Sequence, residues 1–389
     1  EFEIYNDMIV TQVVHLQYEM NEECAYITHL DHEYVFYTVD EYENRMKNAI
    51  FIAGMLLSSF VIRAGDISKY VLDNYLIPVG QSGSVVGRIY PTPSNVRLLS
   101  DTSSLFRIDL KEKSICLKKN RALSAGQTSY RYGITLLIDG QQCEFELLKD
   151  GFSKNRVVAH RGAWRQKGVL QNSVRSFQNA VELGCQGSEL DVWLTADNRV
   201  VLSHDPHVYG LEVENITSLQ LFQQTINEKD PGPSLQELLI AARAQNSTHP
   251  IIEIKDSQKG LERTLQLTDS VVNIVHRMKM QGYVEYISFN YEVLKRIREL
   301  DPTARTLYLW EGKKELKDLV NDRISGIDYS YYAYRQDKNL TQKAREAGLL
   351  TNVWTVNNAE ELQQYYLLGV DYITTDEPEL LLKIIDSLK

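Results

Sequence analysis

Residues 156–205 read RVVAHRGAWRQKGVLQNSVRSFQNAVELGCQGSELDVWLTADNRVVLSHD. Two short apolar runs in this stretch, VVA and VVL, each lead into a polar cluster, HRG at 160–162 and SHD at 203–205. Between them, Glu189 and Asp191 lie two residues apart on a third strand-like run, so both carboxylates face the same way. Two histidines, an arginine and a pair of same-facing carboxylates are the parts that a phosphoester-cleaving site requires.

The chain after residue 150 alternates strand-like and helix-like patterns, which is typical of an α/β fold. Eight strand–helix units predict a closed (β/α)8 barrel over residues 151–389, and a doubly wound open sheet is the alternative. Active sites of such barrels lie at the carboxyl ends of the strands, where the polar clusters fall. We expect strands at 156–160, 187–194, 251–255, 284–289, 304–309, 326–330, 351–355 and 370–374, with a short extra strand at 199–203.

Three carboxylates, Glu189, Asp191 and Glu253, fall near the ends of the second and third predicted barrel strands. They are predicted to bind one divalent cation, and because every ligand is an oxygen, Ca²⁺ or Mg²⁺ is favoured over Zn²⁺. Lys255 lies two residues beyond Glu253 and faces the same way; taken alone, this pair reads as a simple ion pair. In the full set, Lys255 and Arg161 offset the negative charge of a phosphodiester.

His160 and His204 are predicted to be catalytic, together with Arg161. An imidazole titrates near neutral pH, so one histidine can take a proton from the nucleophile while the other donates a proton to the leaving alkoxide. A single histidine at a strand end is usually only a satisfied polar residue, and the combination is what points to catalysis. Trp354 at the end of the seventh strand is predicted to bind substrate, with packing of the barrel rim as the alternative.

The order of these motifs resembles the glycerophosphodiester phosphodiesterase family. The family pattern runs His-Arg-Gly, Pro-Glu-Asn with Thr or Ser, Glu-x-Asp-Val, His-Asp and Glu-x-Lys, and it is matched over residues 156–385. The resemblance implies the same catalytic, metal and substrate positions, hydrolysis of a glycerophosphodiester to glycerol 3-phosphate and an alcohol, and Trp354 against the glycerol carbons. Pro-Glu-Asn reads Leu170-Gln171-Asn172 here, so the role of the family Glu is missing or falls to Gln171.

Two other functions are compatible with the sequence. A phospholipase D-like enzyme acting on lysophospholipid would use the same site and would need an apolar groove at the barrel mouth. A catalytically silent binding protein, whose N-terminal module does the work, predicts damage to the catalytic set, and that set is complete.

Residues 66–150 are predicted to form a small antiparallel β-sandwich, because short runs rich in Val, Ile, Tyr and Phe recur between turn residues. This module resembles a cadherin-like repeat without its acidic calcium-binding motifs. Cys116 and Cys143 lie on neighbouring strand-like runs, so a disulfide is possible in an oxidising compartment, although two buried free thiols are favoured. The expected strands are 84–90, 105–109, 114–118, 129–138 and 142–148.

The N-terminal region differs in composition from the rest. Residues 1–45 form an acidic extension of unclear origin with short strand-like patches, and residues 46–64 have the basic start, apolar centre and small-residue end of a signal peptide. That pattern predicts a periplasmic or secreted protein, and a buried helix or strand is the alternative. The apolar run is too short for a stable membrane span.

Charge is spread unevenly over the chain, whose net charge is −10. Residues 1–44 hold eleven acids and no Lys or Arg, whereas residues 65–389 hold 39 bases and 41 acids. Neither part has the basic surface that nucleic acid binding requires. The predicted partner is therefore a small-molecule phosphodiester drawn in by local positive charge.

Overall fold

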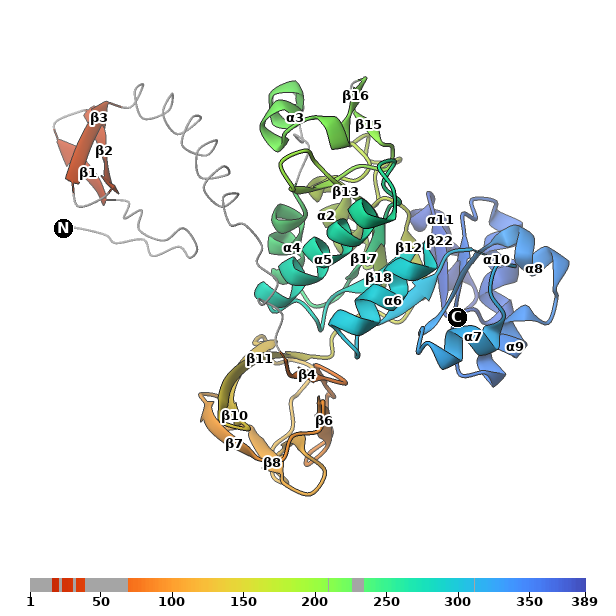
Figure 1. Cartoon of the computed structure of the whole chain (residues 1–389), viewed down its shortest axis with the longest axis horizontal. Helices are drawn as coiled ribbons and strands as arrows, with labels where there is room; N and C mark the ends of the chain where they lie inside the picture. Colours follow the sequence, from red (N-terminus) through yellow and green to blue (C-terminus); the bar gives the residue numbers. More distant parts are fainter. Residues whose placement is uncertain are drawn as a thin grey trace. The chain divides into compact units, whose positions relative to one another are not determined.

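The computed structural model describes residues 69–389 apart from Tyr209, residues 226–233 and Glu311, and also the backbone of three strands near the N-terminus. These strands, β1 (Leu16–Met20), β2 (Glu23–Leu30) and β3 (Glu33–Thr38), form an antiparallel sheet (Figure 1). The signal-peptide-like segment 46–64 lies outside the described residues, so export of the protein stays a prediction.

Eight parallel strands close into a barrel (Figure 1). Closure is direct, because Val158 in the first strand pairs with Gly187 of the second and with Thr374 of the last. This confirms the predicted (β/α)8 barrel and excludes the doubly wound sheet, in which the first and last strands stay apart. The strands are β12 (Val157–Ala159), β13 (Gly187–Leu194), β17 (His249–Ile254), β18 (Glu285–Ser288), β19 (Thr306–Tyr308), β20 (Gly326–Ser330), β21 (Leu350–Trp354) and β22 (Tyr372–Thr375).

Helices follow the strands, and local sequence sets where several of them begin. Ser173 caps the first barrel helix by accepting a hydrogen bond from the Ser176 N–H, and Gly184 ends it in the left-handed region at φ +77°. Asn358 caps a later helix in the same way. The barrel helices are α2 (Val174–Leu183), α4 (Leu235–Arg243), α5 (Leu261–Arg277), α6 (Tyr291–Leu300), α7 (Leu316–Asn321), α8 (Tyr331–Gln336), α9 (Leu340–Glu346), α10 (Ala359–Leu368) and α11 (Pro378–Ser387).

A short insertion leaves the barrel between its second and third strands. It starts with β14 (Val200–Leu202), which confirms the predicted extra strand and pairs antiparallel with β13. It continues through β15 (His207–Val208), β16 (Leu211–Glu212), a 3-10 turn (Val213–Asn215) and α3 (Ser218–Thr225). Because β14 runs back along β13 from Leu194 toward Asp191, whose backbone carbonyl accepts the Ser203 N–H at 3.1 Å, it delivers His204 next to the carboxylate motif.

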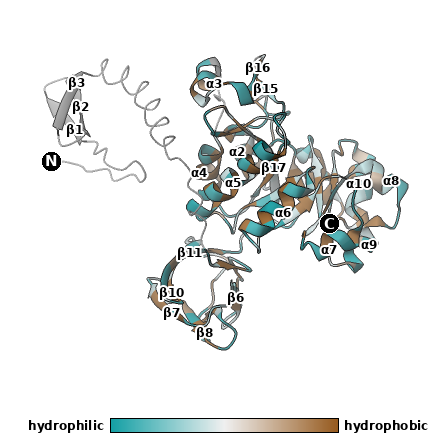
Figure 2. Cartoon of the chain, viewed as in Figure 1, coloured by the Kyte–Doolittle hydropathy of each residue, from teal (hydrophilic) through white to brown (hydrophobic). Residues whose placement is uncertain are grey.

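The barrel strands bury both faces, as a parallel sheet covered by helices must. Val158, Ile251, Ile287 and Tyr372 pack together in one cluster, while the residues that alternate with them, such as Ile252, belong to the larger cluster shared with the helices. Figure 2 shows the hydrophilic residues on the outer faces of helices such as α5 and α6. Two-residue periodicity therefore separates side chains inside the barrel from those that pack beneath the helices.

Residues 71–149 form two four-stranded sheets that share one apolar core including Phe106, Leu117 and Leu136, which confirms the predicted sandwich. The predicted antiparallel order has one exception, since the short strand Leu76–Ile77 pairs parallel with Leu148 and Lys149. Within the described part of the chain, Cys116 and Cys143 are buried free thiols. Val96–Asp101 forms a strand that the sequence patterns did not predict. The first sheet consists of β4 (Val71–Leu72), β6 (Val85–Tyr90), β9 (Ser114–Leu117) and β8 (Phe106–Asp109), and the second of β5 (Leu76–Ile77), β11 (Gln141–Lys149), β10 (Arg131–Ile138) and β7 (Val96–Asp101).

The sandwich and the barrel belong to one compact unit, Arg63–Lys389. Arg243 on α4 forms an ion pair with Glu146 on β11 at 2.6 Å, and Lys279 pairs with Glu144 at 2.6 Å. Leu148 at the end of β11 is buried in the barrel's own core cluster. The connection between the two modules is therefore packed and carries charge pairs.

Among the helices of the described residues, none combines the length and the apolar character needed to cross a membrane.

Candidate active site

The predicted site residues surround one cavity of about 150 Å³ at the carboxyl ends of the barrel strands. This is the end of the barrel at which the polar clusters were expected. Asp191, the remaining predicted residue, joins the group through an ion pair with Lys255. The predicted residues that line the cavity directly are His160, Arg161, Glu189, His204, Glu253, Lys255 and Trp354.

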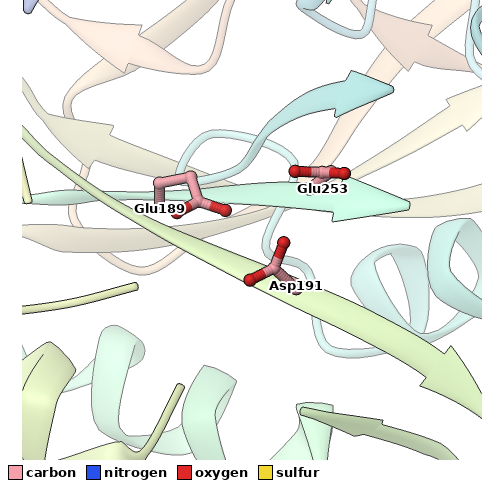
Figure 3. A group of neighbouring side chains, drawn as sticks. All are labelled: Glu189, Asp191 and Glu253. Carbon is pink, nitrogen blue, oxygen red and sulfur yellow. The ribbon is translucent and has the colours of Figure 1, made fainter. Parts of the chain in front are cut away.

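Glu189, Asp191 and Glu253 bring their carboxylates together at the carboxyl ends of β13 and β17. Each offers an oxygen within 4.8 Å of the others, and all three side chains are buried. Figure 3 shows the carboxylates pointing toward a common centre. Oε1 of Glu189 is buried and meets no hydrogen-bond donor among the described residues. An all-oxygen set with an unpartnered buried carboxylate oxygen fits a hard divalent cation.

The proximity of these carboxylates disturbs their titration. Burial, with the charges of Asp191 and Glu253, raises the pKa of Glu189 well above its ordinary value. Burial and the Asp191 charge raise the pKa of Glu253 to about 8. Burial also acts to raise the pKa of Asp191, but Lys255 and His204 outweigh it and hold that pKa below its ordinary value. The three groups carry their full negative charge only when positive charge lies beside them.

Lys255 supplies part of that positive charge. Its Nζ lies 2.7 Å from Oδ1 of Asp191 and 2.6 Å from Oε1 of Glu253. Burial acts to lower the pKa of Lys255, but the two carboxylates outweigh it and raise the pKa above its ordinary value. The ammonium group therefore stays charged at the edge of the carboxylate cluster.

The turn after β12 places Arg161 over the carboxylates. The backbone N–H of Arg161 donates to Oε2 of Glu189 at 2.8 Å, and its guanidinium donates to Oε1 of Gln171 at 2.9 Å. Gly162 has φ +81°, and a Cβ there would lie 2.7 Å from the backbone of Ser176, so the turn requires glycine. Gln171, at the position where the resemblance predicted Glu, thus holds the arginine through a neutral amide.

Asn172 orients the central carboxylate from the neighbouring loop. Its Nδ2 donates to Oδ2 of Asp191 at 2.8 Å, and its Oδ1 accepts the Asp191 backbone N–H at 2.9 Å. Asn172 is 5% exposed, so solvent does not compete strongly for these bonds. The motif residue beside the Gln171 departure therefore keeps a direct link to the carboxylate cluster.

His160 is oriented by an acid on the last barrel strand's loop. Its Nδ1 lies 2.7 Å from Oδ1 of Asp376, whose Oδ2 accepts from Asn357 at 2.7 Å and from Arg165 at 3.2 Å. Burial acts to raise the pKa of Asp376, but the hydrogen bond from His160 outweighs it, so the pKa lies below its ordinary value. An ionised carboxylate only accepts, so Nδ1 of His160 carries the hydrogen and Nε2 is left for chemistry.

His204 has a similar but more exposed arrangement. Its Nδ1 lies 2.8 Å from Oδ1 of Asp205, and its side chain is 33% exposed. Burial lowers the pKa of His204, an effect that the Asp191 charge opposes. His160 precedes the carboxylate motif in the sequence and His204 follows it, yet both line one cavity. Each is bonded through Nδ1 to an acid.

The opposite wall of the cavity is apolar. Trp354 packs edge-to-face on Phe289, with ring centroids 5.7 Å apart, and its Nε1 donates to the backbone carbonyl of Asp328 at 2.8 Å. Ile287 and Leu309 complete this wall. The polar half carries the charge chemistry, while the apolar half suits the carbon atoms of a small substrate.

The structure adds site residues that received no role from the sequence, namely Asp376, Asn357, Asp205 and Asp328. The first three reach the site through hydrogen bonds, and Asp328 lines the cavity. Asp205 follows His204 directly in the sequence, so the motif could have identified it as the acid that bonds to His204. Asp376, which is bonded to His160, and Asn357, which is bonded to Asp376, come from the opposite end of the barrel sequence, and no spacing rule could connect them with His160.

Comparison with known proteins agrees with this geometry. The model of the glycerophosphoryl diester phosphodiesterase family matches residues 160–380. The glycerophosphodiester phosphodiesterase of Caldanaerobacter subterraneus subsp. tengcongensis is 25% identical over 241 residues, covering 60% of this chain and 98% of the relative.

Solved structures show the same barrel. A glycerophosphodiester phosphodiesterase from Parabacteroides distasonis is 34% identical, with a TM-score of 0.58 over 61% of this chain and 99% of that one. An Oleispira antarctica phosphodiesterase, solved with the product sn-glycerol-3-phosphate, shares the fold at 20% identity and a TM-score of 0.52, covering 59% of this chain and 96% of that one. With its family match spanning more than half of the chain and its motif residues gathered in one cavity, the protein belongs to the glycerophosphoryl diester phosphodiesterase family.

Proposed function

We propose that this protein hydrolyses glycerophosphodiesters to glycerol 3-phosphate and an alcohol, in a reaction that depends on a divalent cation. The observation that carries the proposal is one cavity lined both by carboxylates of an oxygen-only cluster and by two histidines. The names of the relatives point to the same substrate class.

Glu189, Asp191 and Glu253 would hold the cation, and their oxygen ligands favour Ca²⁺ or Mg²⁺. Bound there, the ion supplies positive charge that draws in a phosphate oxygen and lowers the pKa of an attacking hydroxyl. Asn172 and the Arg161 backbone N–H keep two of the carboxylates oriented for this role.

The other cavity residues bind the phosphodiester and move protons. Arg161 and Lys255 offset the growing negative charge on the phosphoryl oxygens. One of His160 and His204 removes the proton from the attacking oxygen, and the other gives a proton to the departing alkoxide oxygen as the phosphorus–oxygen bond breaks. Trp354 packs against the glycerol carbons.

The direct test is turnover of sn-glycero-3-phosphocholine by the full chain, measured as the release of choline. Activity should appear with added Ca²⁺ or Mg²⁺ and disappear with excess EDTA. If none of these conditions gives turnover of this diester or of glycerophosphodiesters with other head groups, the proposal is wrong.

The second candidate is cleavage of lysophospholipid by the same site. Trp310 favours it, because this side chain is 42% exposed and packs edge-to-face on Phe289, with centroids 6.2 Å apart, next to the cavity. An acyl chain could lie on such a surface. Phosphorus NMR of the products from lysophosphatidylcholine and from glycerophosphocholine separates the two functions, and it also reveals any cyclic phosphate.

A further inference from the structure

Asp328 presents a carboxyl group to the catalytic cavity from the side opposite the carboxylate cluster. It lies in the middle of β20 and lines the same cavity as His160, Glu189 and Lys255. Its neighbours Ile327 and Tyr329 belong to the core shared with the helices, so the strand alternation directs Asp328 into the barrel. The side chain is buried, with 1% of its surface exposed.

Within the described residues this carboxyl group has no cationic partner, and one of its oxygens has no hydrogen-bond partner. Oδ1 of Asp328 is buried and has no hydrogen-bond partner in the part of the chain that the structure describes. Trp354 donates its Nε1–H to the backbone carbonyl of Asp328 and not to the carboxyl group. Asn352, opposite Asp328 in the sheet, donates from Nδ2 to Oγ1 of Thr374 at 2.8 Å. Its side chain also acts to lower the pKa of Asp328 through a hydrogen bond, but this neutral amide brings no positive charge.

Glu285 shows what a structural acid in this barrel looks like. It is about equally buried, and although its Oε2 also has no partner among the described residues, its Oε1 accepts from the cationic Arg305 at 2.6 Å and from Tyr372 at 3.0 Å. A buried acid without a cation beside it destabilises the fold, and burial, which outweighs the hydrogen bond from Asn352, raises the pKa of Asp328 to about 7. A group that costs stability and faces the active cavity is a candidate for ligand binding.

The surroundings of Asp328 define what could bind there. Ile287, Leu309 and Trp354 offer apolar surface beside it, and the phosphate-binding groups Arg161 and Lys255 lie on the other side of the same small cavity. A ligand that reaches both regions must have a phosphoryl group, a short carbon chain and a hydrogen-bond donor. Glycerol 3-phosphate has these three features in that order.

We propose that Asp328 accepts a hydrogen bond from a free hydroxyl of the substrate's glycerol moiety and so selects glycerophosphodiesters over phosphodiesters without that hydroxyl. The inference rests on the proposed function and deepens it by naming a residue that reads the glycerol. Sites that hydrogen-bond a substrate hydroxyl reject analogues lacking it, because the buried acceptor is then left unpaired.

The test compares two choline diesters that differ only in the glycerol. The ratio of kcat/KM for sn-glycero-3-phosphocholine to that for n-propylphosphocholine is measured in the wild type, Asp328→Ala and Asp328→Asn. The wild-type ratio should be about tenfold or more, and Asp328→Ala should lower it by roughly ten- to a hundredfold, as expected for a bond to a buried carboxyl group. Asp328→Asn keeps an acceptor oxygen and should retain part of the preference.

Glu285→Gln is the matched control, since it removes a buried acid from the same barrel interior. It should lower the melting temperature without changing the ratio of the two substrates. An unchanged ratio in Asp328→Ala, or a wild type that does not distinguish the substrates, would overturn the inference while leaving the proposed function intact. The inference would also be overturned if Asp328→Ala changed the preference between head groups of different charge and not the preference for glycerol. That preference is the ratio of kcat/KM for glycerophosphoethanolamine to kcat/KM for glycerophosphoglycerol.

Binding provides a readout that does not need turnover. Calorimetric titration of the cation-loaded protein should show that sn-glycerol 3-phosphate binds at least about tenfold more tightly than n-propyl phosphate, and that Asp328→Asn narrows this gap. Equal affinity of the wild type for the two ligands would overturn the inference even if Asp328→Ala does not fold. If the protein turned over no glycerophosphodiester but still bound sn-glycerol 3-phosphate more tightly than n-propyl phosphate, the result would count against the proposed function alone.

Discussion

Nδ1 of His160 lies 2.7 Å from Oδ1 of Asp376, although 216 positions separate the two residues in the chain. The other carboxylate oxygen of Asp376 is held by Asn357 and Arg165. Both of these partners donate hydrogen bonds, which favours the ionised form of Asp376. An ionised carboxylate can only accept a hydrogen bond from His160. The arrangement selects the tautomer of His160 that leaves Nε2 unprotonated on the cavity side.

Asp376→Asn should therefore impair His160 without removing it. Asn357 and Arg165 would attract the oxygen of the new amide, so its NH2 group would face Nδ1 and force the other tautomer. We expect kcat to fall by at least about tenfold, because the wrong tautomer cannot exchange protons correctly. Asp371→Asn is the control, since Asp371 bonds to Thr351 at the opposite end of β22 and should affect stability more than kcat. Equal loss of kcat in both variants would contradict this role.

His160→Ala and His204→Ala should each reduce turnover by roughly a hundredfold or more, the usual contribution of general acid–base catalysis. The melting temperature should change little, because neither ring is part of an apolar core cluster. Steady-state kinetics on glycerophosphocholine measures the effect, with the exposed His207→Ala as control. Near-normal rates in both variants would show that these histidines do not transfer the protons.

Removal of the divalent cation should abolish activity, and Ca²⁺ or Mg²⁺ should restore it. Added cation should also raise the melting temperature, because it binds the folded carboxylate cluster and not the unfolded chain. Glu189→Gln should weaken both effects through loss of one ligand charge. Glu285→Gln removes a buried acid that bonds to Arg305 and should leave the cation response unchanged. A chelated wild type with full activity and an unchanged melting curve would refute a cation requirement.

Asp328→Asn should change how stability depends on pH. Burial raises the pKa of Asp328 from its ordinary 3.8 to about 7, so the folded protein favours the protonated form. The stability from that proton is fully present below pH 3.8 and is lost as the pH rises through about 7. Asn does not ionise. The melting temperature of the variant minus that of the wild type should therefore increase from pH 4 to pH 8, measured with a chelator present.

Glu285→Gln should show the opposite trend. Burial acts to raise the pKa of Glu285, but Arg305 outweighs it and holds the pKa below its ordinary value. The stability that ionised Glu285 contributes is present above the unfolded pKa and is lost as the pH falls. The melting temperature of Glu285→Gln should therefore lie furthest below that of the wild type at neutral pH. Parallel melting curves for the wild type and Asp328→Asn at every pH would contradict the perturbed titration of Asp328.

A chain that begins at Lys149 should keep its chemistry and lose stability. The predicted site residues all follow position 155, and the barrel has its own core. The truncation removes Leu148 from that core and Glu146 from its ion pair with Arg243, so a lower melting temperature is expected. Turnover of glycerophosphocholine below the melting temperature should stay close to that of the full chain. A folded but inactive truncated protein would mean that the sandwich contributes to the site.

Local patterns in the amino-acid sequence were enough to predict the barrel and most of the site residues. Alternation of strand and helix patterns is local, and so is the two-residue period that places Glu189 with Asp191 and Glu253 with Lys255 on one face. The polar residues after each strand could be assigned to one end of the barrel because all its strands run parallel. The motif order then led to the family that the comparisons show.

The distant residues that complete the site could be identified from the folded chain alone. Closure pairs β12 with β22, and this brings Asp376 to His160 across almost the whole barrel sequence. Asp328 resembles any other polar residue in a strand when the sequence is read alone. In the structure it differs from Glu285 because it lines the cavity and has no arginine beside its carboxyl group. Periodicity tells which face of a strand a side chain takes. What that side chain meets there depends on strand register and barrel closure, which join residues that no local pattern connects.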